Sequence, residues 1–255
     1  IDRFEEENPN VNINYTGISF WDYFTKITTA MTDSTGPDVY IQTIKDTGDR
    51  ARGGVSMNLS PFFDDSFNAG EDFFYSQDVL PMTYEDNVYG IPYSLDNRVL
   101  YYNIDIVNEL EDTTDEDWKN TIVGQKEGTT ITGKPEDLIG EDGNVRAPET
   151  YDELLAYQEL MTHTESGKIT QMGFDVNIGN CKIENVVWTQ GGAFFDENGN
   201  PIVNTDEGVR KGFETWYELT HTLPQAKVNA FVDTVSDSTE NLFWSGLVGM
   251  MITTN

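Results

Sequence analysis

The spacing of apolar and polar residues changes period in the first part of the chain. Val11, Ile13 and Tyr15 alternate with asparagines, which predicts a half-buried strand. A helical stripe of apolar residues follows, preceded by Ser19 and Asp22 in the arrangement of a capping box. The stripe consists of Phe20, Tyr23, Phe24, Ile27, Ala30 and Met31.

Two further features place these elements in an α/β fold. A helix at the start of the chain is expected to end at Asn8-Pro9, because proline disfavours helical geometry in the residue before it. Residues 39–41 form a short apolar run behind the Gly36-Pro37 turn, which predicts a buried strand. Helices and strands therefore alternate, and this order indicates an open α/β sheet.

The character of the sequence changes after Asn103. Residues 104–110 predict a short helix, whereas residues 111–148 are polar, acidic and rich in glycine. A stretch of this length and composition predicts a surface insertion, with Trp118 as its anchor. Thr150 and Glu153 then form a capping box for a helix that is expected to reach Thr164.

More helices are predicted towards the C-terminal end. Residues 182–190 predict a helix closed by two glycines, and residues 196–200 carry the Asn-Gly signal of a hairpin. Thr205 is the expected cap of a long helix, and alternating apolar residues from Val248 to Ile252 predict a strand. The apolar face of the long helix would contain Val209, Phe213, Trp216 and Tyr217.

Composition and charge narrow the class of protein. The chain has 255 residues with 37% hydrophobic and 12% aromatic residues, enough for a sizeable core in one large domain or two ordinary ones. Its 45 acidic and 15 basic residues give a net charge of −30, which argues against binding to nucleic acid or to an anionic membrane. Such a charge favours a soluble monomer or suits a salty medium.

The single cysteine and the chain ends do not indicate in which compartment the protein works. Cys181 has no partner for an intrachain disulfide and is expected to be a small buried apolar residue. Neither a signal peptide nor a membrane-spanning stretch is recognisable. Because the sequence begins within a predicted helix and ends within a predicted strand, we expect it to be truncated at both ends.

Signals of catalysis or of metal and cofactor binding do not stand out. Carboxylate pairs are easily found among 45 acids, so they do not indicate a glycosidase. His163 and His221 lie in no metal-binding or triad motif, and neither a P-loop nor a GxGxxG occurs. Residues 196–200 superficially suggest calcium, but the glycine is out of register for an EF-hand loop. No catalytic residue, metal or cofactor is therefore predicted.

Several motifs, in order along the chain, carry a family resemblance. Residues 87–103 predict a short strand, a polar bend at Ser94-Leu95-Asp96-Asn97 and a second strand. Together with Thr35-Gly36-Pro37-Asp38-Val39 and the run from Phe243 to Ile252, this segment resembles family 1 of the extracellular solute-binding proteins. That family contains carbohydrate receptors of ABC importers such as maltose-binding protein. Tyr151 stands where the family usually has tryptophan, a change that keeps the packing role.

The resemblance implies a two-lobed α/β receptor of the periplasmic-binding-protein type. Lobe one would comprise residues 1–103 and lobe two residues 104–255, both incomplete and the second carrying the insertion at 111–148. The receptor would close on a carbohydrate by a hinge and deliver it to ABC-transporter permease subunits in the membrane, as an extracellular lipoprotein or in the periplasm. A secreted carbohydrate-active enzyme, and a sugar sensor or adhesion module without a transporter, remain the alternatives.

A carbohydrate site needs aromatic planes for the apolar faces of the sugar and fixed polar groups for its hydroxyls. Trp21 and Trp188 are the aromatic candidates, with core packing as the alternative for each, whereas Trp216 and Trp244 are expected in the core. Most polar candidates follow predicted strands or lie in the bend, where an Asx turn is the alternative, and Asn180 lies with Trp188 in a segment that resembles the family's helix with tryptophan and two glycines. The polar candidates are Gln42, Thr43, Asp96, Asn97, Asn180, Thr253, Thr254 and Asn255.

Overall fold

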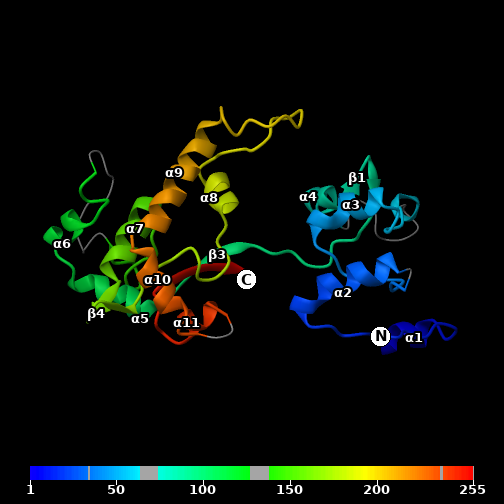
Figure 1. Ribbon diagram of the computed structural model, residues 1–255, viewed down its shortest axis with the longest axis horizontal. Coiled ribbons are helices and arrows are strands. Elements are labelled where there is room, and N and C mark those ends of the chain that lie inside the picture. The colour runs from blue at the N-terminus through cyan, green and yellow to red at the C-terminus, as the bar shows by residue number, and fades with distance from the viewer. Residues whose placement is uncertain (34, 64–73, 127–137, 236–237, 255) are drawn as a thin grey trace. The chain divides into compact units, whose positions relative to one another are not determined.

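The computed structural model describes residues 1–33, 35–63, 74–126, 138–235 and 238–254, and the chain forms two compact units (Figure 1). Unit 1 spans Ile1–Leu95 and unit 2 spans Asp96–Asn255. The division falls before the boundary expected after Asn103, so the strand that begins at Arg98 belongs to unit 2.

Unit 1 is built from short helices and one small hairpin. The longest helix, α2, begins after Ser19, whose side chain makes no capping hydrogen bond, contrary to the predicted capping box. On its stripe Ile27 is buried, with 4% of its surface exposed, whereas Phe20 is 65% exposed. The elements are α1 (Asp2–Glu7), α2 (Phe20–Thr32), η1 (Ile44–Asp46), α3 (Thr47–Arg52), η2 (Ser60–Phe62), α4 (Ser76–Val79), η4 (Leu80–Met82), β1 (Thr83–Tyr84) and β2 (Asn87–Val88).

The two strands predicted in unit 1 from short apolar patterns do not form. Residues 11–15 and 39–41 have no regular secondary structure. Tyr15 is 76% exposed and Val39 is 87% exposed. A strand is stabilised by hydrogen bonds and side-chain pairs with a neighbour. Among the described residues of this unit, only β1 and β2 pair with each other, so the two apolar segments lack the partner that a sheet would give them.

Unit 2 is organised around the antiparallel pair β3 (Arg98–Tyr102) and β6 (Met250–Thr254). The register runs from Arg98 opposite Thr254 to Tyr102 opposite Met250. On the other side of β6, residues 172–179 run parallel to it through bridges at Met172–Val248 and Gly179–Ile252. The strand predicted near the C-terminal end is therefore present as the middle strand of this group.

Both faces of this pair are covered by hydrophobic clusters, because side chains alternate along a strand. Leu100, Met250 and Ile252 contact the first cluster, which also contains Trp118 and Tyr157. Tyr101 and Met251 contact the second cluster, which contains residues of the last helices. The remaining elements of unit 2 are α5 (Ile104–Val107), η5 (Asn108–Asp112), α6 (Asp115–Asn120), α7 (Tyr151–Leu160), β4 (His163–Glu165), β5 (Lys168–Gln171), α8 (Ile183–Thr189), α9 (Glu207–His221), α10 (Gln225–Val232) and α11 (Glu240–Trp244).

The predicted insertion is tied to the core of unit 2 at Trp118. This residue is 2% exposed, as predicted for an anchor, and its indole N–H donates to Thr113 Oγ1 over 3.0 Å. The helix α6 that carries it starts with a capping box between Thr114 and Asp117. Residues 127–137 of the expected insertion lie outside the described residues.

Two helix predictions for unit 2 need correction. Thr150 caps α7 by accepting from the Glu153 N–H, as predicted, but α7 ends at Leu160, short of the predicted Thr164. Asp206, not Thr205, caps α9, because its carboxylate accepts from the Val209 N–H.

The predicted burial of aromatic residues in unit 2 is right in part. Trp216 packs against the first cluster, as predicted. Phe213 and Tyr217 are instead 46% and 62% exposed, because α9 buries the neighbouring face that contains Gly212. Trp244 is also exposed, at 64%, contrary to its expected core position.

The helices α8 and α9 approach so closely that glycines are required at the contact. A Cβ atom on Gly212 would lie 2.6 Å from the Val187 Cα, and one on Gly208 would lie 2.5 Å from the Gly192 Cα. Both values are far below ordinary van der Waals contact. The position of Trp188 on α8 is therefore set by backbone-to-backbone packing.

Two other sequence features have a clear structural outcome. Cys181 is buried at 3% exposure, as predicted, and burial raises the pKa of its thiol to about 11. Across the described part of the chain, no helix combines the length and the apolar character needed to cross a membrane.

Candidate functional site

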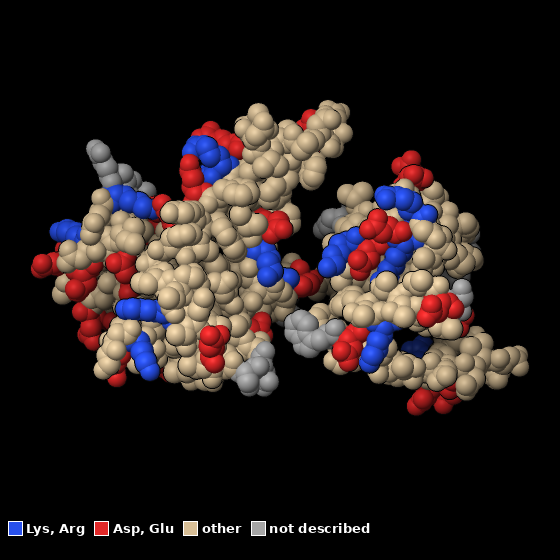
Figure 2. All heavy atoms as spheres, viewed as in Figure 1, with Lys and Arg blue, Asp and Glu red and all other residues tan. Residues whose placement is uncertain are grey.

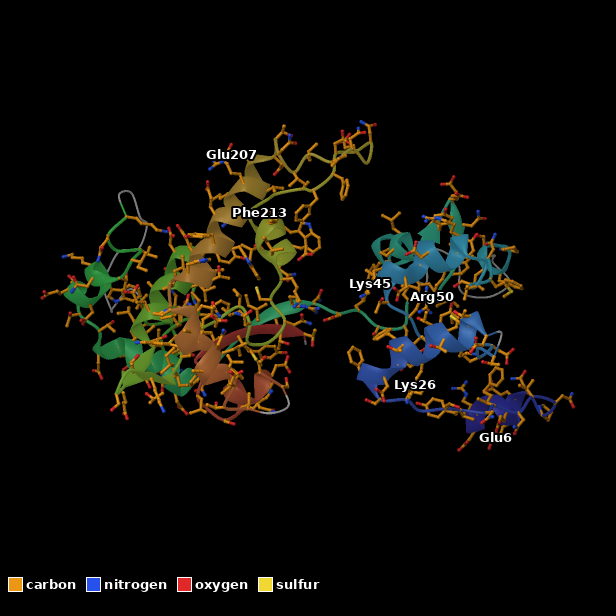
Figure 3. The ribbon with its side chains drawn as sticks, in the orientation of Figure 1. Glu6, Lys26, Lys45, Arg50, Glu207 and Phe213 are labelled. Atoms are coloured by element: carbon orange, nitrogen blue, oxygen red, sulfur yellow. The ribbon has the colours of Figure 1, made fainter. Side chains whose placement is uncertain are left out.

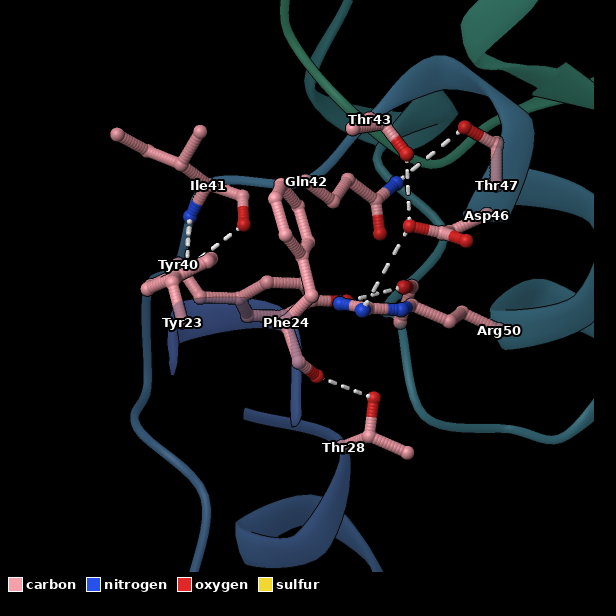
Figure 4. A network of polar contacts seen from close by, with 11 residues as sticks. Tyr23, Phe24, Thr28, Tyr40, Ile41, Gln42, Thr43, Asp46, Thr47 and Arg50 are labelled. Atoms are coloured by element: carbon pink, nitrogen blue, oxygen red, sulfur yellow. Dashed lines mark hydrogen bonds and ion pairs between the residues drawn. The ribbon is translucent and has the colours of Figure 1, made fainter. Parts of the chain in front are cut away.

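The predicted polar residues of unit 1 belong to a hydrogen-bonded network around η1 and α3 (Figure 4). Gln42 Nε2 donates to Thr47 Oγ1 over 3.3 Å, and Thr43 Oγ1 donates to Asp46 Oδ2 over 2.8 Å. The Arg50 guanidinium lies 3.9 Å from Asp46 and 5.1 Å from the centre of the Tyr40 ring. Gln42 and Thr43 thus lie in one polar cluster, directly after the apolar residues 39–41.

Among the described residues, two atoms of this network are buried without a hydrogen-bond partner. They are Gln42 Oε1, an acceptor, and Arg50 Nη1, a donor. The Arg50 side chain is only 11% exposed. A buried polar atom without a hydrogen bond costs free energy, so these atoms are suited to binding a small polar group such as water or a hydroxyl. Asp46, Thr47 and Arg50 join the candidate site although no local sequence pattern indicates them.

In unit 2, Asp96 and Asn180 are brought together by Arg98 at the start of β3. Arg98 Nη1 lies 2.6 Å from Asp96 Oδ2, and Arg98 Nε donates to the Asn180 carbonyl over 3.1 Å. The Asn180 N–H in turn donates to the Ile252 carbonyl of β6 over 2.7 Å. Two candidates separated widely in sequence therefore share one arginine.

Trp188 lies on α8, the helix that follows Asn180 and Lys182. It is 59% exposed, and its ring meets Phe194 edge-to-face at 6.5 Å. Core packing, the alternative for this residue, does not apply, because the neighbouring Val186 and Val187 fill the interior. An exposed indole held by an edge contact suits stacking on the apolar face of a sugar.

The other candidate residues differ in their exposure to solvent, and some are not described by the structure. Asn97 is an exposed residue between Asp96 and β3, and Thr254 is exposed at the end of β6. Thr253 is buried and its hydroxyl donates to Glu240, so it serves packing rather than a ligand. Trp21 lies in α2 but its side chain is outside what the structure describes, and Asn255 lies outside the described residues.

A surface hollow lies elsewhere, along α9, the helix on which Figure 3 labels Glu207 and Phe213. It has a volume of about 630 Å³ and is lined by residues such as Val203, Arg210 and Phe213. None of the predicted ligand residues lines it. A shallow depression of this kind, on one helix, does not provide the converging polar groups of a ligand site.

The charged side chains at the surface reflect the acidic composition of the chain. Asp and Glu side chains are scattered over the visible faces of both units, with fewer Lys and Arg among them (Figure 2). Within the described residues, no group of three or more His, Cys, Asp and Glu side chains could hold a metal ion. The candidate residues in each unit are hydrogen-bonding or aromatic groups.

Asp175 gives a prediction about stability against pH. Burial raises the pKa of its carboxyl group, although Oδ1 accepts from the backbone and side-chain N–H groups of Asn177. Between the unfolded pKa of about 4 and the higher folded pKa, the folded state binds more protons, so stability falls as pH rises through this window. Asp175→Asn keeps an acceptor and removes the charge. Its midpoint of thermal unfolding should exceed that of the unmodified protein at neutral pH and should not at low pH.

Asp196→Asn is the matched control for this prediction. Hydrogen bonds from Asn200 and Asn198 lower the pKa of the Asp196 carboxyl, so ionised Asp196 stabilises the fold above about pH 4. Its replacement should lower the unfolding midpoint at neutral pH. The account of Asp175 is wrong if Asp175→Asn also lowers the midpoint there.

Comparison with solved structures identifies the fold. CpMnBP1 with mannotriose bound matches with a TM-score of 0.71 at 22% identity, over 99% of this chain and 57% of that one. The ABC substrate-binding protein Lmo0181 of Listeria monocytogenes, in complex with cycloalternan, matches with a TM-score of 0.70 at 21% identity, over 99% of this chain and 56% of that one. These matches confirm the predicted two-lobed, periplasmic-binding-protein-like α/β fold.

The chain belongs to the bacterial extracellular solute-binding protein family, whose model matches residues 1–255. This confirms the resemblance inferred from the motifs. A Brucella abortus (strain 2308) protein, whose name describes it as a binding protein, is 22% identical over 98% of this chain and 52% of its own length. The chain thus spans about half the length of the curated relatives it matches.

Proposed function

We propose that this chain is part of the substrate-binding component of an ABC importer, which captures an oligosaccharide outside the cytoplasm and delivers it to a membrane permease. The observation that carries the proposal is the group in unit 2, where Arg98 holds Asp96 and Asn180 together and the next helix exposes Trp188. Family membership and two similar structures with bound oligosaccharides support it.

The proposed mechanism is binding without chemistry. The two units correspond to the two lobes, and residues 89–97, which form no helix or strand, contain the hinge. Polar groups of unit 1 around Gln42 and Thr43 and those of unit 2 would both contact the sugar. Contacts made only in the closed state favour that state by their differential affinity. Extracellular anchoring as a lipoprotein is part of the same proposal.

Thermal unfolding of the full-length protein against a panel of mono- and oligosaccharides tests the proposal. A ligand at about 100 times its dissociation constant adds roughly 2.7 kcal/mol to the free energy of unfolding, which raises the midpoint by several degrees. We expect a selective shift with the sugar recovered intact. Hydrolysed sugar would instead identify an enzyme, and binding without loss of uptake in a deletion strain would identify a sensor. No shift with any sugar would contradict the proposal.

Trp188→Ala is expected to weaken oligosaccharide binding by about 1–3 kcal/mol, because a stacked aromatic ring commonly contributes this much to affinity. Isothermal titration gives the dissociation constants. Trp244→Ala is the matched control, since Trp244 is similarly exposed in the same unit but outside the candidate site. Equal affinities for the Trp188→Ala and Trp244→Ala variants would remove Trp188 from the site.

A further inference from the structure

Arg98 lies close in sequence to the point where unit 1 ends and unit 2 begins. Unit 2 begins at Asp96, and Arg98 is the first residue of β3. Its side chain is 24% exposed and uses two different nitrogens, Nη1 toward the Asp96 carboxylate and Nε toward the Asn180 carbonyl. One planar guanidinium therefore fixes both a side chain and a backbone loop.

The loop that Arg98 contacts is itself fixed to the sheet. Gly179 has a φ of 85°, and a Cβ atom there would lie 2.6 Å from the Ile252 carbonyl oxygen. Its N–H donates to Thr239 Oγ1 over 3.3 Å, and the next N–H, that of Asn180, bonds to β6. Arg98 thus joins Asp96 to a rigid platform.

The residues before Asp96 lack regular secondary structure and expose large apolar side chains. Residues 89–97 form no helix or strand. Tyr93 is 83% exposed and Leu95 is 62% exposed. The Asp96 carboxylate is itself 51% exposed and forms an ion pair with Arg98 of unit 2.

We propose that Arg98 is a positioning residue for the ligand site. It holds the Asp96 carboxylate and the Asn180 loop in their binding arrangement before the ligand arrives, without contacting the sugar. This rests on the proposed function. Groups ordered in advance lose less conformational freedom on binding, so pre-organisation raises affinity. A partly exposed ion pair contributes little to folding stability, so the effect of Arg98 should appear in binding rather than in unfolding.

A double-mutant cycle with mannotriose as the probe tests this role in the full-length protein. Arg98→Ala should weaken binding about tenfold, and Arg98→Lys should restore only part of it because lysine lacks the planar fork. Combined with Asp96→Ala, Arg98→Ala should add little further loss, since each change abolishes the same arrangement. Arg210→Ala is the matched control, an arginine paired 2.6 Å from Glu214 on α9, and should bind like the unmodified protein. Unchanged affinity, or losses that multiply, would overturn the proposal.

Hydrogen exchange of the ligand-free protein gives an independent readout. In Arg98→Ala the amide of Asn180, which is hydrogen-bonded to the Ile252 carbonyl, should exchange at least several-fold faster, while those in α9 stay unchanged. An unchanged exchange rate at Asn180 would refute the positioning role, whether or not the affinity for the sugar changes. If the unmodified protein binds no sugar but exchange accelerates as expected, the proposed function fails while the structural role of Arg98 stands.

Discussion

Trp118→Ala is expected to lower the free energy of unfolding by about 3–5 kcal/mol, the usual cost of removing a large buried aromatic side chain. The indole is 2% exposed, meets the Tyr157 ring edge-to-face at 5.9 Å and donates a hydrogen bond to Thr113. Its loss leaves a cavity in the first cluster and removes one hydrogen bond of the Thr113 hydroxyl, which still donates to the Leu110 carbonyl. The cluster extends to Leu100 and Met250, so the damage reaches the central strand pair.

Equilibrium unfolding in urea measures this effect, with Trp118→Phe as a milder variant that keeps most of the ring. The phenylalanine variant should lie between the alanine variant and the unmodified protein. A loss below about 1 kcal/mol for Trp118→Ala would mean that α6 and its surroundings are not part of the cooperative core, since full burial of an aromatic residue stabilises by more than that.

Gly212→Ala should destabilise the protein by about 1–3 kcal/mol and also weaken ligand binding. In an exposed helix the same change usually stabilises by roughly 0.5–1 kcal/mol, because glycine has the greater backbone freedom to lose. Here the added Cβ would lie 2.6 Å from the Val187 Cα, so α8 must move away from α9. Trp188, the residue after Val187, moves with it.

Gly48→Ala in α3 is the matched control, because the nearest atom to its Cβ would be Tyr84 Cδ2 at 3.4 Å, an ordinary contact. Urea unfolding should show no loss for this variant. If Gly212→Ala unfolds like the control, the two helices can separate without cost, and the close packing is not what positions Trp188.

Local sequence signals predicted the helices better than the strands. Thr150, Trp118 and the apolar run at the C-terminal end indicate elements that form. Residues 11–15 and 39–41 carry strand patterns but no strand, since a strand depends on a neighbour that local sequence does not specify. Periodicity predicts Phe213 and Tyr217 in the core, because it identifies an apolar stripe on the helix but not which edge of that stripe is covered by neighbouring elements.

The candidate site shows the same limit. Gln42 and Thr43 are predicted as ligand residues because ligands bind beyond the carboxyl ends of strands, although the strand before them does not form. Asp96 and Asn180 are predicted from the family resemblance. All four stay predictions. Arg98 is not among the sequence candidates, because its role depends on a carbonyl 82 residues away along the chain, a contact that no local pattern predicts.

The uneven burial of the two units has a consequence for how the protein responds to heat. Ile27 is the single hydrophobic residue of unit 1 that is buried among those described, whereas unit 2 contains both hydrophobic clusters. A calorimetric scan should therefore show unit 1 losing its order first, with a small enthalpy, and unit 2 melting later in a separate transition. A solute that contacts unit 1 would then raise the first transition above all, so its measured affinity would include the free energy of ordering that unit.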